Sequence, residues 1–294
     1  MTLNKILSNL VVFSYFSQLR PISASFDNGI NGFNYDNTLK WISENPLCSG
    51  FRQSPISLDR QISSPLVIYP ITFHNFDVEL QGPVHVTNNG NAVEMDVENT
   101  VNGFHPFITG GGLSGVYQVE NVHFHWGSNQ IRGSEHAVGG QKYDLEMHIV
   151  CKNIKFGSLA EARDDPFGIA VMGVLFKEVD TNSLEHPLKP IIDLLPSLTK
   201  AGSVSQIAQP LKLSSLLSRL NPKYFYTYRG SLTTPPCSQS VTWLVFEHIQ
   251  EIPPNSLHQF WRLRDADDLP LVNNFRPLQQ LNNRKIFSRN AKRK

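Results

Sequence analysis

Polar and apolar residues alternate along two runs of the sequence, 116–126 and 143–150. Side chains two positions apart in a β-strand point to the same face, so this alternation predicts two strands with unlike faces. In the first run, one face carries Val119, Asn121, His123 and His125, opposite Gln118, Val122 and Phe124. In the second run, Glu146, His148 and Val150 share a face, opposite Leu145, Met147 and Ile149.

If these two strands pair with their histidine-bearing faces together, His123, His125 and His148 converge on one point. Three imidazoles with an open fourth position are typical of a catalytic zinc ion, whereas structural zinc is usually closed by four ligands and often uses cysteines. A lone histidine in a half-buried strand is more often a hydrogen-bonded core residue, and cupin-type metal sites also begin with His-x-His. The spacing alone leaves these alternatives open.

The remaining pattern indicates the fold class. Between residues 66 and 119, short β-branched and aromatic runs alternate with turn signals, which predicts a mostly antiparallel sheet. Further along, the sequence predicts a short helix over 156–163, a buried strand over 168–176, a helix over 187–195 and a strand over 241–246. The expected fold is therefore mainly β (α+β), with a large twisted, mostly antiparallel sheet and short peripheral helices.

The chain has 294 residues, a formal net charge of +1 and a pI near 7.8. This balance gives no reason to expect a nucleic-acid partner. No repeat or linker divides the chain, which predicts a single domain over residues 25–294. Basic residues concentrate only near the C-terminus, where a solvated basic tail is expected from about residue 284. They are Arg284, Lys285, Arg289, Lys292, Arg293 and Lys294.

The N-terminal residues have the pattern of an export signal. Lys5 precedes an apolar stretch over 6–16, and small residues follow around Ala24. This predicts a signal peptide over residues 1–24 and a secreted, extracellular protein. The apolar stretch is too short to span a bilayer, so no transmembrane span is expected.

Three cysteines, Cys48, Cys151 and Cys237, fit a secreted protein in which two are paired. The sequence alone leaves all three pairings open. By alternation, Cys151 lies on the face with Met147 and Ile149, away from the histidines. A buried, small hydrophobic role is expected for it.

Several motifs together resemble the α-class carbonic anhydrases of the secreted type. They are His-Phe-His-Trp-Gly-Ser at 123–128, Gly-Ser-Glu-His at 133–136 and Tyr-Asp-Leu-Glu-Met-His at 143–148. Gln-Ser-Pro-Ile at 53–56, the segment 224–237 and Asn-Phe-Arg-Pro at 274–277 add to the resemblance, with Phe275 where tryptophan is usual. The resemblance covers roughly residues 26–288. It implies reversible hydration of carbon dioxide to bicarbonate and a proton through a zinc-bound hydroxide.

The resemblance also implies roles for individual residues. His123, His125 and His148 would bind Zn2+, Thr233 would orient the hydroxide, and Glu135 would accept the proton of the Thr233 hydroxyl. Four residues would support the imidazoles: Asn121, Glu146, His136 and Tyr228. Six would form the substrate pocket, although the apolar ones fit a plain core equally well: Val150, Val171, Leu232, Thr234, Val241 and Trp243.

The chain departs from the family where its fastest members carry a proton-shuttle histidine. Here that position is Asn91, and an amide does not titrate near neutral pH, so slower turnover is expected. Glu94 stands nearby, where the family often has a neutral amide. Tyr35 aligns with a tyrosine at the active-site mouth. The family pattern also favours a disulfide between Cys48 and Cys237, which leaves Cys151 free.

Two other functions are also compatible with parts of the pattern. A non-enzymatic binding or structural protein on the same fold would be expected to have lost ligands, yet all three histidines, Glu135 and Thr233 are present. A cupin-like oxygenase would need a glutamate a few residues after His-x-His, whereas Glu135 follows His125 by ten. The resemblance further implies inhibition by aromatic sulfonamides. It leaves the oligomeric state open, with a monomer as the default.

Overall fold

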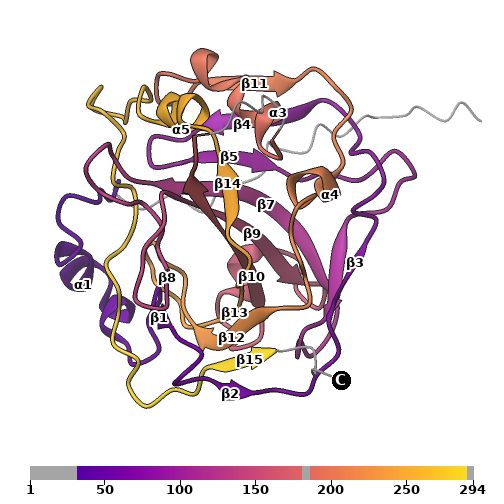
Figure 1. Cartoon of the computed structure of the whole chain (residues 1–294), viewed down its shortest axis with the longest axis vertical. Coiled ribbons are helices and arrows are strands. Elements are labelled where there is room, and N and C mark those ends of the chain that lie inside the picture. The colour runs from indigo at the N-terminus through magenta and orange to yellow at the C-terminus, as the bar shows by residue number, and fades with distance from the viewer. Residues whose placement is uncertain (1–31, 181–185, 290–294) are drawn as a thin grey trace, which may run out of the picture.

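The structure is a computed structural model that describes residues 32–180 and 186–289. Within these residues, a large twisted sheet crosses the molecule and short helices lie around it (Figure 1). The expected signal peptide over 1–24 lies outside the described residues. The mainly β fold expected from the sequence is confirmed.

Over the described residues, the central sheet has 13 strands. Its main path runs in the order β11 (Val204–Ile207), β4 (Val84–Asn88), β5 (Val93–Asp96), β7 (Tyr117–Trp126), β9 (Leu145–Asn153), β10 (Ile169–Glu178), β13 (Val241–Phe246), β12 (Phe225–Gly230), β15 (Phe287–Arg289) and β2 (Ser64–Pro65). Three strands pair beside this path: β3 (Ile71–His74), β6 (Phe107–Gly110) and β14 (Gln250–Ile252). A separate parallel pair consists of β1 (Ser57–Leu58) and β8 (Ala137–Val138).

Most strand pairs in the central sheet are antiparallel, as expected. The sheet is nevertheless mixed, because β10 pairs in parallel with β13 and β14, and β15 pairs in parallel with β2. The strand expected over 168–176 is β10, and the one expected over 241–246 is β13.

The helices are short, and α3 and α5 lie together at the upper end of the molecule in Figure 1. They are α1 (Lys40–Glu44), α2 (Leu159–Ala162), α3 (Lys189–Ile192), α4 (Leu213–Leu216), α5 (Pro254–Phe260) and the 3₁₀ helices Pro46–Ser49 and Leu195–Ser197. The helices expected over 156–163 and 187–195 are α2 and α3, both shorter than expected. The start of α2 is fixed by Ser158, whose side chain accepts the N–H of Glu161.

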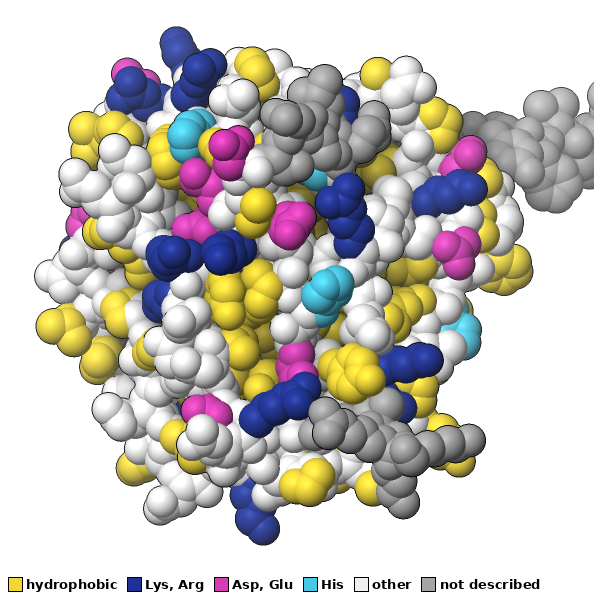
Figure 2. All heavy atoms as spheres, viewed as in Figure 1, with side chains coloured by type: hydrophobic (Ala, Val, Ile, Leu, Met, Phe, Trp, Pro, Cys, Tyr) yellow, Lys and Arg dark blue, Asp and Glu magenta, His cyan; other side chains and the backbone are white. Residues whose placement is uncertain are grey.

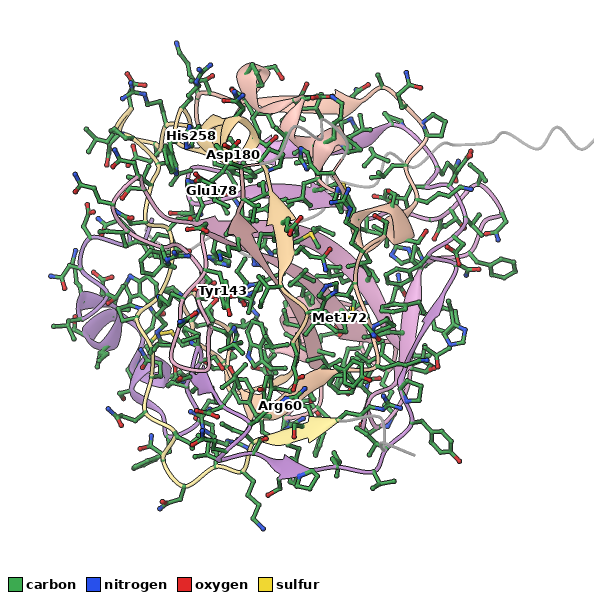
Figure 3. The ribbon with its side chains drawn as sticks, in the orientation of Figure 1. Arg60, Tyr143, Met172, Glu178, Asp180 and His258 are labelled. Atoms are coloured by element: carbon green, nitrogen blue, oxygen red, sulfur yellow. A yellow bond between two sulfur atoms is a disulfide. The ribbon has the colours of Figure 1, made fainter. Side chains whose placement is uncertain are left out.

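The two faces of the sheet carry separate apolar clusters. The larger cluster contains Phe124, Met147 and Met172 from the central strands, together with Phe260 from α5 (Figure 3 labels Met172). The smaller cluster lies on the face that bears the histidines and includes Trp243. Both faces of the central strands are therefore buried, and polar groups placed between them are shielded from water.

One expectation for β7 was wrong. The pairing of β7 with β9 shifts register between Val119 and Asn121, so Glu120 is an extra residue in the ladder. Because the extra residue reverses the alternation, Val119 packs in the larger cluster with Val122 and does not share a face with His123. Nothing in the alternation of residue types marks such an insertion.

Residues 284–289 belong to the fold, so the solvated basic tail expected from about residue 284 is not found over this range. Arg284 is half-buried and donates to the main-chain oxygen of Arg229, and Phe287–Arg289 form β15 between β12 and β2. The edge of β12 has main-chain groups that need partners, and this segment supplies them. Residues 290–294 lie outside the described part.

Charged side chains of both signs are interspersed on the face drawn in Figure 2. Two ion pairs lie near opposite ends of the molecule (Figure 3): Arg60 with Glu247, and His258 with Glu178, where Nε2 lies 3.7 Å from Oε2. Among the helices of the described part, none is long and apolar enough to cross a membrane.

Candidate metal centre and active site

The pairing of β7 with β9 brings three histidines together. His123 lies directly opposite His148, and His125 lies opposite Glu146 in the same register. One ring nitrogen from each of the three imidazoles lies within 4.8 Å of the others. His125 and His148 are buried, and His123 is half-buried. The convergence expected from the alternation is therefore present in the structure.

Two of the imidazoles are held through Nδ1. His123 Nδ1 lies 3.0 Å from Asn121 Oδ1, so the short asparagine side chain still reaches the ring. His125 Nδ1 lies 2.7 Å from the main-chain oxygen of Asn274, an acceptor that the sequence reasoning missed. A carbonyl oxygen only accepts, so each Nδ1 carries the proton and each Nε2 is left with a lone pair. His125 Nε2 is buried and lacks a hydrogen-bond partner within the described residues.

The third imidazole is held through Nε2. Glu146 Oε1 lies 2.9 Å from His148 Nε2 and 2.7 Å from His136 Nδ1, while Oε2 accepts the main-chain N–H of His136 at 2.7 Å. His136 Nε2 lies 2.7 Å from the Tyr228 hydroxyl, which donates to Ser54 Oγ at 2.9 Å. These bonds leave His148 Nδ1 directed at the other imidazoles. They also engage His136 as a support and not as a ligand.

Burial sets the protonation state of the cluster. It lowers the pKa of His123 well below its ordinary value, and the neighbouring imidazoles lower it further. Burial also lowers the pKa of His125, with Glu135 opposing the shift. Burial alone would raise the pKa of Glu146, but His136 and the third histidine outweigh it and hold that pKa well below its usual range. Neutral imidazoles and an ionised supporting carboxylate are the states that metal binding requires.

The donor set therefore fits a zinc ion. It supplies three ring nitrogen atoms, each on a ring oriented by an oxygen acceptor on its far side, with no fourth protein ligand within the described residues. The buried lone pair of His125 Nε2 most clearly indicates a metal-binding site, because burying a polar atom without a partner costs free energy.

Glu135 lies beside this centre. Its Oε1 accepts the main-chain N–H of Arg276 at 2.8 Å, and its Oε2 lies 3.7 Å from His125 Nε2. This Oε2 is buried and has no hydrogen-bond partner in the part of the chain that the structure describes. The hydrogen bond expected from the Thr233 hydroxyl is thus not formed in this structure. Thr233 does reach the centre, because it lines a cavity next to His123.

That cavity has a volume of about 30 Å³. It is lined by His123, His148, Val150, Val171, Leu232, Thr233, Thr234 and Trp243. The volume matches about one water molecule's share of the liquid, so the space suits a species of a few atoms. Five of the six expected pocket residues meet here. Val241 does not line the cavity and packs in the smaller apolar cluster behind it.

Asn91 borders a different space. A cavity of about 430 Å³ lies between residues 32–36, 89–91, 265–267 and 270–272. Tyr35, the residue expected at the active-site mouth, lines the same cavity and makes an edge contact with Trp41. The main chain of Asn91 is fixed by Asn274 Nδ2 on its oxygen and Asn89 Oδ1 on its N–H, both at 3.0 Å.

Glu94 lies near both His123 and the turn that carries Asn91. It pairs with His123 across β5 and β7, which places its side chain on the face of the metal centre. Asn89 Nδ2, from the turn that carries Asn91, lies 3.4 Å from Glu94 Oε2. The Glu94 side chain is therefore on the face of the histidines and also contacts the turn that carries Asn91.

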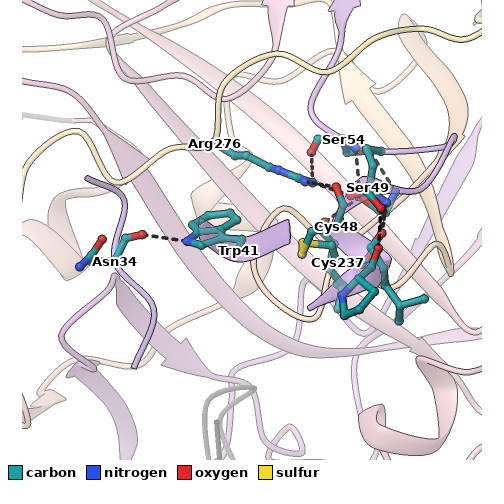
Figure 4. Close-up of a disulfide and its surroundings, with 12 residues drawn as sticks. Asn34, Trp41, Cys48, Ser49, Ser54, Cys237 and Arg276 are labelled. Atoms are coloured by element: carbon teal, nitrogen blue, oxygen red, sulfur yellow. Dashed lines mark hydrogen bonds between the residues drawn. A yellow bond between two sulfur atoms is a disulfide. The ribbon is translucent and has the colours of Figure 1, made fainter. Parts of the chain in front are cut away.

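The cysteines follow the expectation. Cys48 and Cys237 form a disulfide beside the aromatic ring of Trp41 (Figure 4), and Cys151 is a buried free thiol in the larger apolar cluster. Burial raises the pKa of the Cys151 thiol, which keeps it protonated. The disulfide joins the N-terminal part of the chain to the loop that bears Thr233.

A sheet that presents three inward imidazoles with an open position, beside a threonine and a buried glutamate, has the arrangement of a catalytic metal centre. Comparison with known proteins places it further. The model of the eukaryotic-type carbonic anhydrase family matches residues 36–290. The chain is 35% identical over 254 residues to carbonic anhydrase 15 of Mus musculus, which covers 84% of this chain and 78% of that protein. It is 34% identical over 275 residues to carbonic anhydrase 7 of Homo sapiens, covering 88% and 97%.

The chain therefore belongs to the eukaryotic-type carbonic anhydrase family, and it is an enzyme of the carbonate dehydratase class. Carbon dioxide and bicarbonate are the substrates that this family implies.

Proposed function

We propose that this chain hydrates carbon dioxide reversibly at a zinc ion held by His123, His125 and His148. The observation that carries the proposal is the convergence of three imidazoles whose other nitrogens are all fixed by oxygen acceptors. When bound, zinc supplies the positive charge that activates water for attack on carbon dioxide, chemistry for which carbonic anhydrase is itself the standard example. The rest of the mechanism belongs to the residues around the ion.

Thr233 and Glu135 orient the attacking water. In this role Glu135 Oε2 accepts the Thr233 hydroxyl proton, a bond that is not formed in this structure, and the threonine oxygen is left to accept a hydrogen from the water. The water then directs a lone pair toward the substrate carbon. Two observations support this role: Glu135 Oε2 is a buried acceptor with no partner within the described residues, and Thr233 lines the cavity beside the imidazoles.

The small cavity holds the substrate against its apolar wall. Val150, Val171, Leu232 and Trp243 present apolar atoms beside His123. Carbon dioxide is small and carries no charge, so an apolar wall accommodates it without an unpaired polar group. Thr234 supplies a polar rim to the same space.

Proton export limits the turnover. Asn91 cannot take a proton from the reacting water, so regeneration depends on buffer molecules or on a weaker relay through Glu94. This chain is accordingly slower than members of the family that carry histidine at this position.

The proposal extends to the setting of the enzyme. It is a secreted, extracellular protein whose signal peptide spans residues 1–24 and whose single domain spans 25–294, and it acts as a monomer that aromatic sulfonamides inhibit. The disulfide supports the secreted setting, because such bonds persist in oxidising compartments.

Zinc content and hydration rate in matched variants test the proposal. The purified chain is expected to hold one zinc ion, and His148→Ala is expected to lose both the ion and the activity while remaining folded. His74→Ala is the control, because His74 lies on β3 and contacts Thr109, away from the centre. Full zinc retention in His148→Ala would remove that residue from the ligand set, and a zinc-loaded chain with no hydration would favour the non-enzymatic alternative.

A further inference from the structure

Arg276 is a buried arginine whose guanidinium donates to uncharged oxygen atoms and lies 5.8 Å from the centroid of the Trp41 ring. Its side chain donates from Nη1 to Gln53 Oε1 at 2.7 Å and to the Ser54 carbonyl at 3.0 Å. Nη2 donates to the Cys48 carbonyl at 2.9 Å, and Figure 4 shows the arginine reaching toward the disulfide. The residue is 3% exposed, and burial lowers its pKa to about 10, with Glu135 opposing the shift. A charge buried at this cost needs these acceptors in place.

The other end of Arg276 reaches the active site. Its main-chain N–H donates to Glu135 Oε1 at 2.8 Å. This is the hydrogen bond that fixes one oxygen of the glutamate, while the other oxygen stays open beside His125. A shift of the Arg276 main chain therefore moves the carboxylate.

The acceptors of the guanidinium are tied to the loop that carries Thr233. Cys48 is disulfide-bonded to Cys237, and Gln53 Nε2 donates to the Cys237 carbonyl at 3.3 Å. The N–H of Cys237 in turn donates to the oxygen of Thr234 at 2.8 Å. Arg276 is thus bonded on one side to Glu135 and on the other to the segment that holds the threonine loop.

We infer that Arg276 is a positioning residue, which fixes Glu135 relative to Thr233 by clamping residues 48–54 and the disulfide-linked loop. Arg276 does not contact the zinc ligands by any hydrogen bond or ion pair in the described residues, so the clamp acts on the orientation of the attacking water and leaves metal binding alone. The inference rests on the proposed function of the zinc centre, because the pair it positions is catalytic only there.

The first test measures activity in Arg276 variants. In Arg276→Gln, zinc content is expected to match the wild type while kcat/KM for hydration falls by roughly 10-fold to 100-fold, the usual range for residues that support a metal site from behind its ligands. Arg276→Lys keeps the charge, so its kcat/KM is expected to fall less than that of Arg276→Gln. Arg289→Gln is the matched control, since Arg289 is half-buried and also donates to main-chain oxygens, those of Ile68 and Lys223, at the far edge of the sheet.

Chemical rescue separates positioning from general damage. In Arg276→Ala, added guanidinium at low, non-denaturing concentration is expected to restore part of kcat/KM. The free ion can occupy the space that the Arg276 side chain leaves and donate to the same oxygen atoms. Neither the wild type nor Arg289→Ala should gain. An unchanged kcat/KM in zinc-loaded Arg276→Gln, or a folded Arg276→Ala that guanidinium does not improve, would overturn the inference.

A second experiment does not depend on activity. It tests the inference even if the Arg276 variants fail to fold or the wild type does not hydrate carbon dioxide. Hydrogen exchange at the Arg276 amide is measured in the wild-type protein before and after reduction of the Cys48–Cys237 bond. Reduction is expected to speed hydrogen exchange at the Arg276 amide, while the amide of Ile149 in β9 stays protected. Unchanged exchange at Arg276 in the reduced protein would contradict the clamp. Absence of hydration by the wild type would instead refute the proposed function and leave the exchange result to decide on the clamp.

Discussion

Glu146 Oε1 lies 2.9 Å from Nε2 of His148, and this contact turns Nδ1 of the histidine toward the other two imidazoles. The carboxylate fits there because Gly173 is its neighbour on β10: a Cβ at that position would lie 3.0 Å from the same oxygen. The strand behind the ligands therefore leaves room for the group that orients one of them.

Replacement of this carboxylate should weaken metal binding. Glu146→Gln removes the charge that two histidines share and places an amide donor against their N–H groups. We expect zinc affinity to fall by roughly 10-fold to 100-fold. Competition with a chromophoric chelator measures it, and Glu178→Gln, at the C-terminal end of β10, is the control. Equal affinity in the two variants would mean that Glu146 does not orient His148.

The threonine and glutamate should act as one unit. Thr233→Ala and Glu135→Gln are each expected to lower kcat/KM with zinc still bound, because both orient water and neither holds the ion. In the double variant the loss should be smaller than the product of the single losses. Stopped-flow hydration measures all three, with Thr72→Ala on β3 as control. Strictly multiplicative losses would show that the two residues act separately.

Asn91→His should restore a proton shuttle. The main-chain bonds of this residue do not involve its side chain, so the substitution should leave the turn in place. Because imidazole titrates near neutral pH, kcat at low buffer concentration should rise while kcat/KM changes little. The wild type should in turn be accelerated by small imidazole buffers. If the wild type ignores buffer and the variant gains nothing, another group, such as Glu94, moves the proton.

The metal-free protein should lose stability in mild acid. A histidine in the unfolded chain titrates at about pH 6.5. Burial holds the pKa of His123 and His125 lower in the folded protein. Below that pH the unfolded chain binds more protons, so the free energy of unfolding falls as the pH drops. Urea unfolding at about pH 7.5 and about pH 5.5 measures this. In His123→Asn, the free energy of unfolding should differ less between the two pH values than in the wild type. An equal difference would exclude His123 as a source of the pH dependence.

Much of the site could be predicted because it depends on alternation and motifs. The two-residue spacing placed His123 and His125 on one face, and the same rule separated Cys151 from His148. The rule failed at Val119, because an inserted residue in a ladder leaves no mark in the residue pattern. It also could not show that Glu135 lacks a bond from Thr233 here, since that depends on how two loops meet.

Contacts to main-chain atoms also could not be predicted from the sequence. The oxygen of Asn274 that fixes His125 and the N–H of Arg276 that fixes Glu135 belong to groups that every residue carries. No side-chain pattern distinguishes them, and only the motif at 274–277 indicated that the segment mattered. The pairing of β15 with β12 escaped prediction for the same reason, because a short edge strand forms where another strand leaves its main chain unpaired.

Carbon dioxide hydration by this chain is expected to depend on zinc at these three histidines. The most direct measurement is stopped-flow hydration by the wild-type chain as purified, after removal of metal by a chelator, and after stoichiometric zinc is returned. Activity is expected in the first state, its loss in the second and its recovery in the third at one zinc per chain. Full activity in the metal-free protein, or no activity in a folded chain with zinc restored, would contradict it.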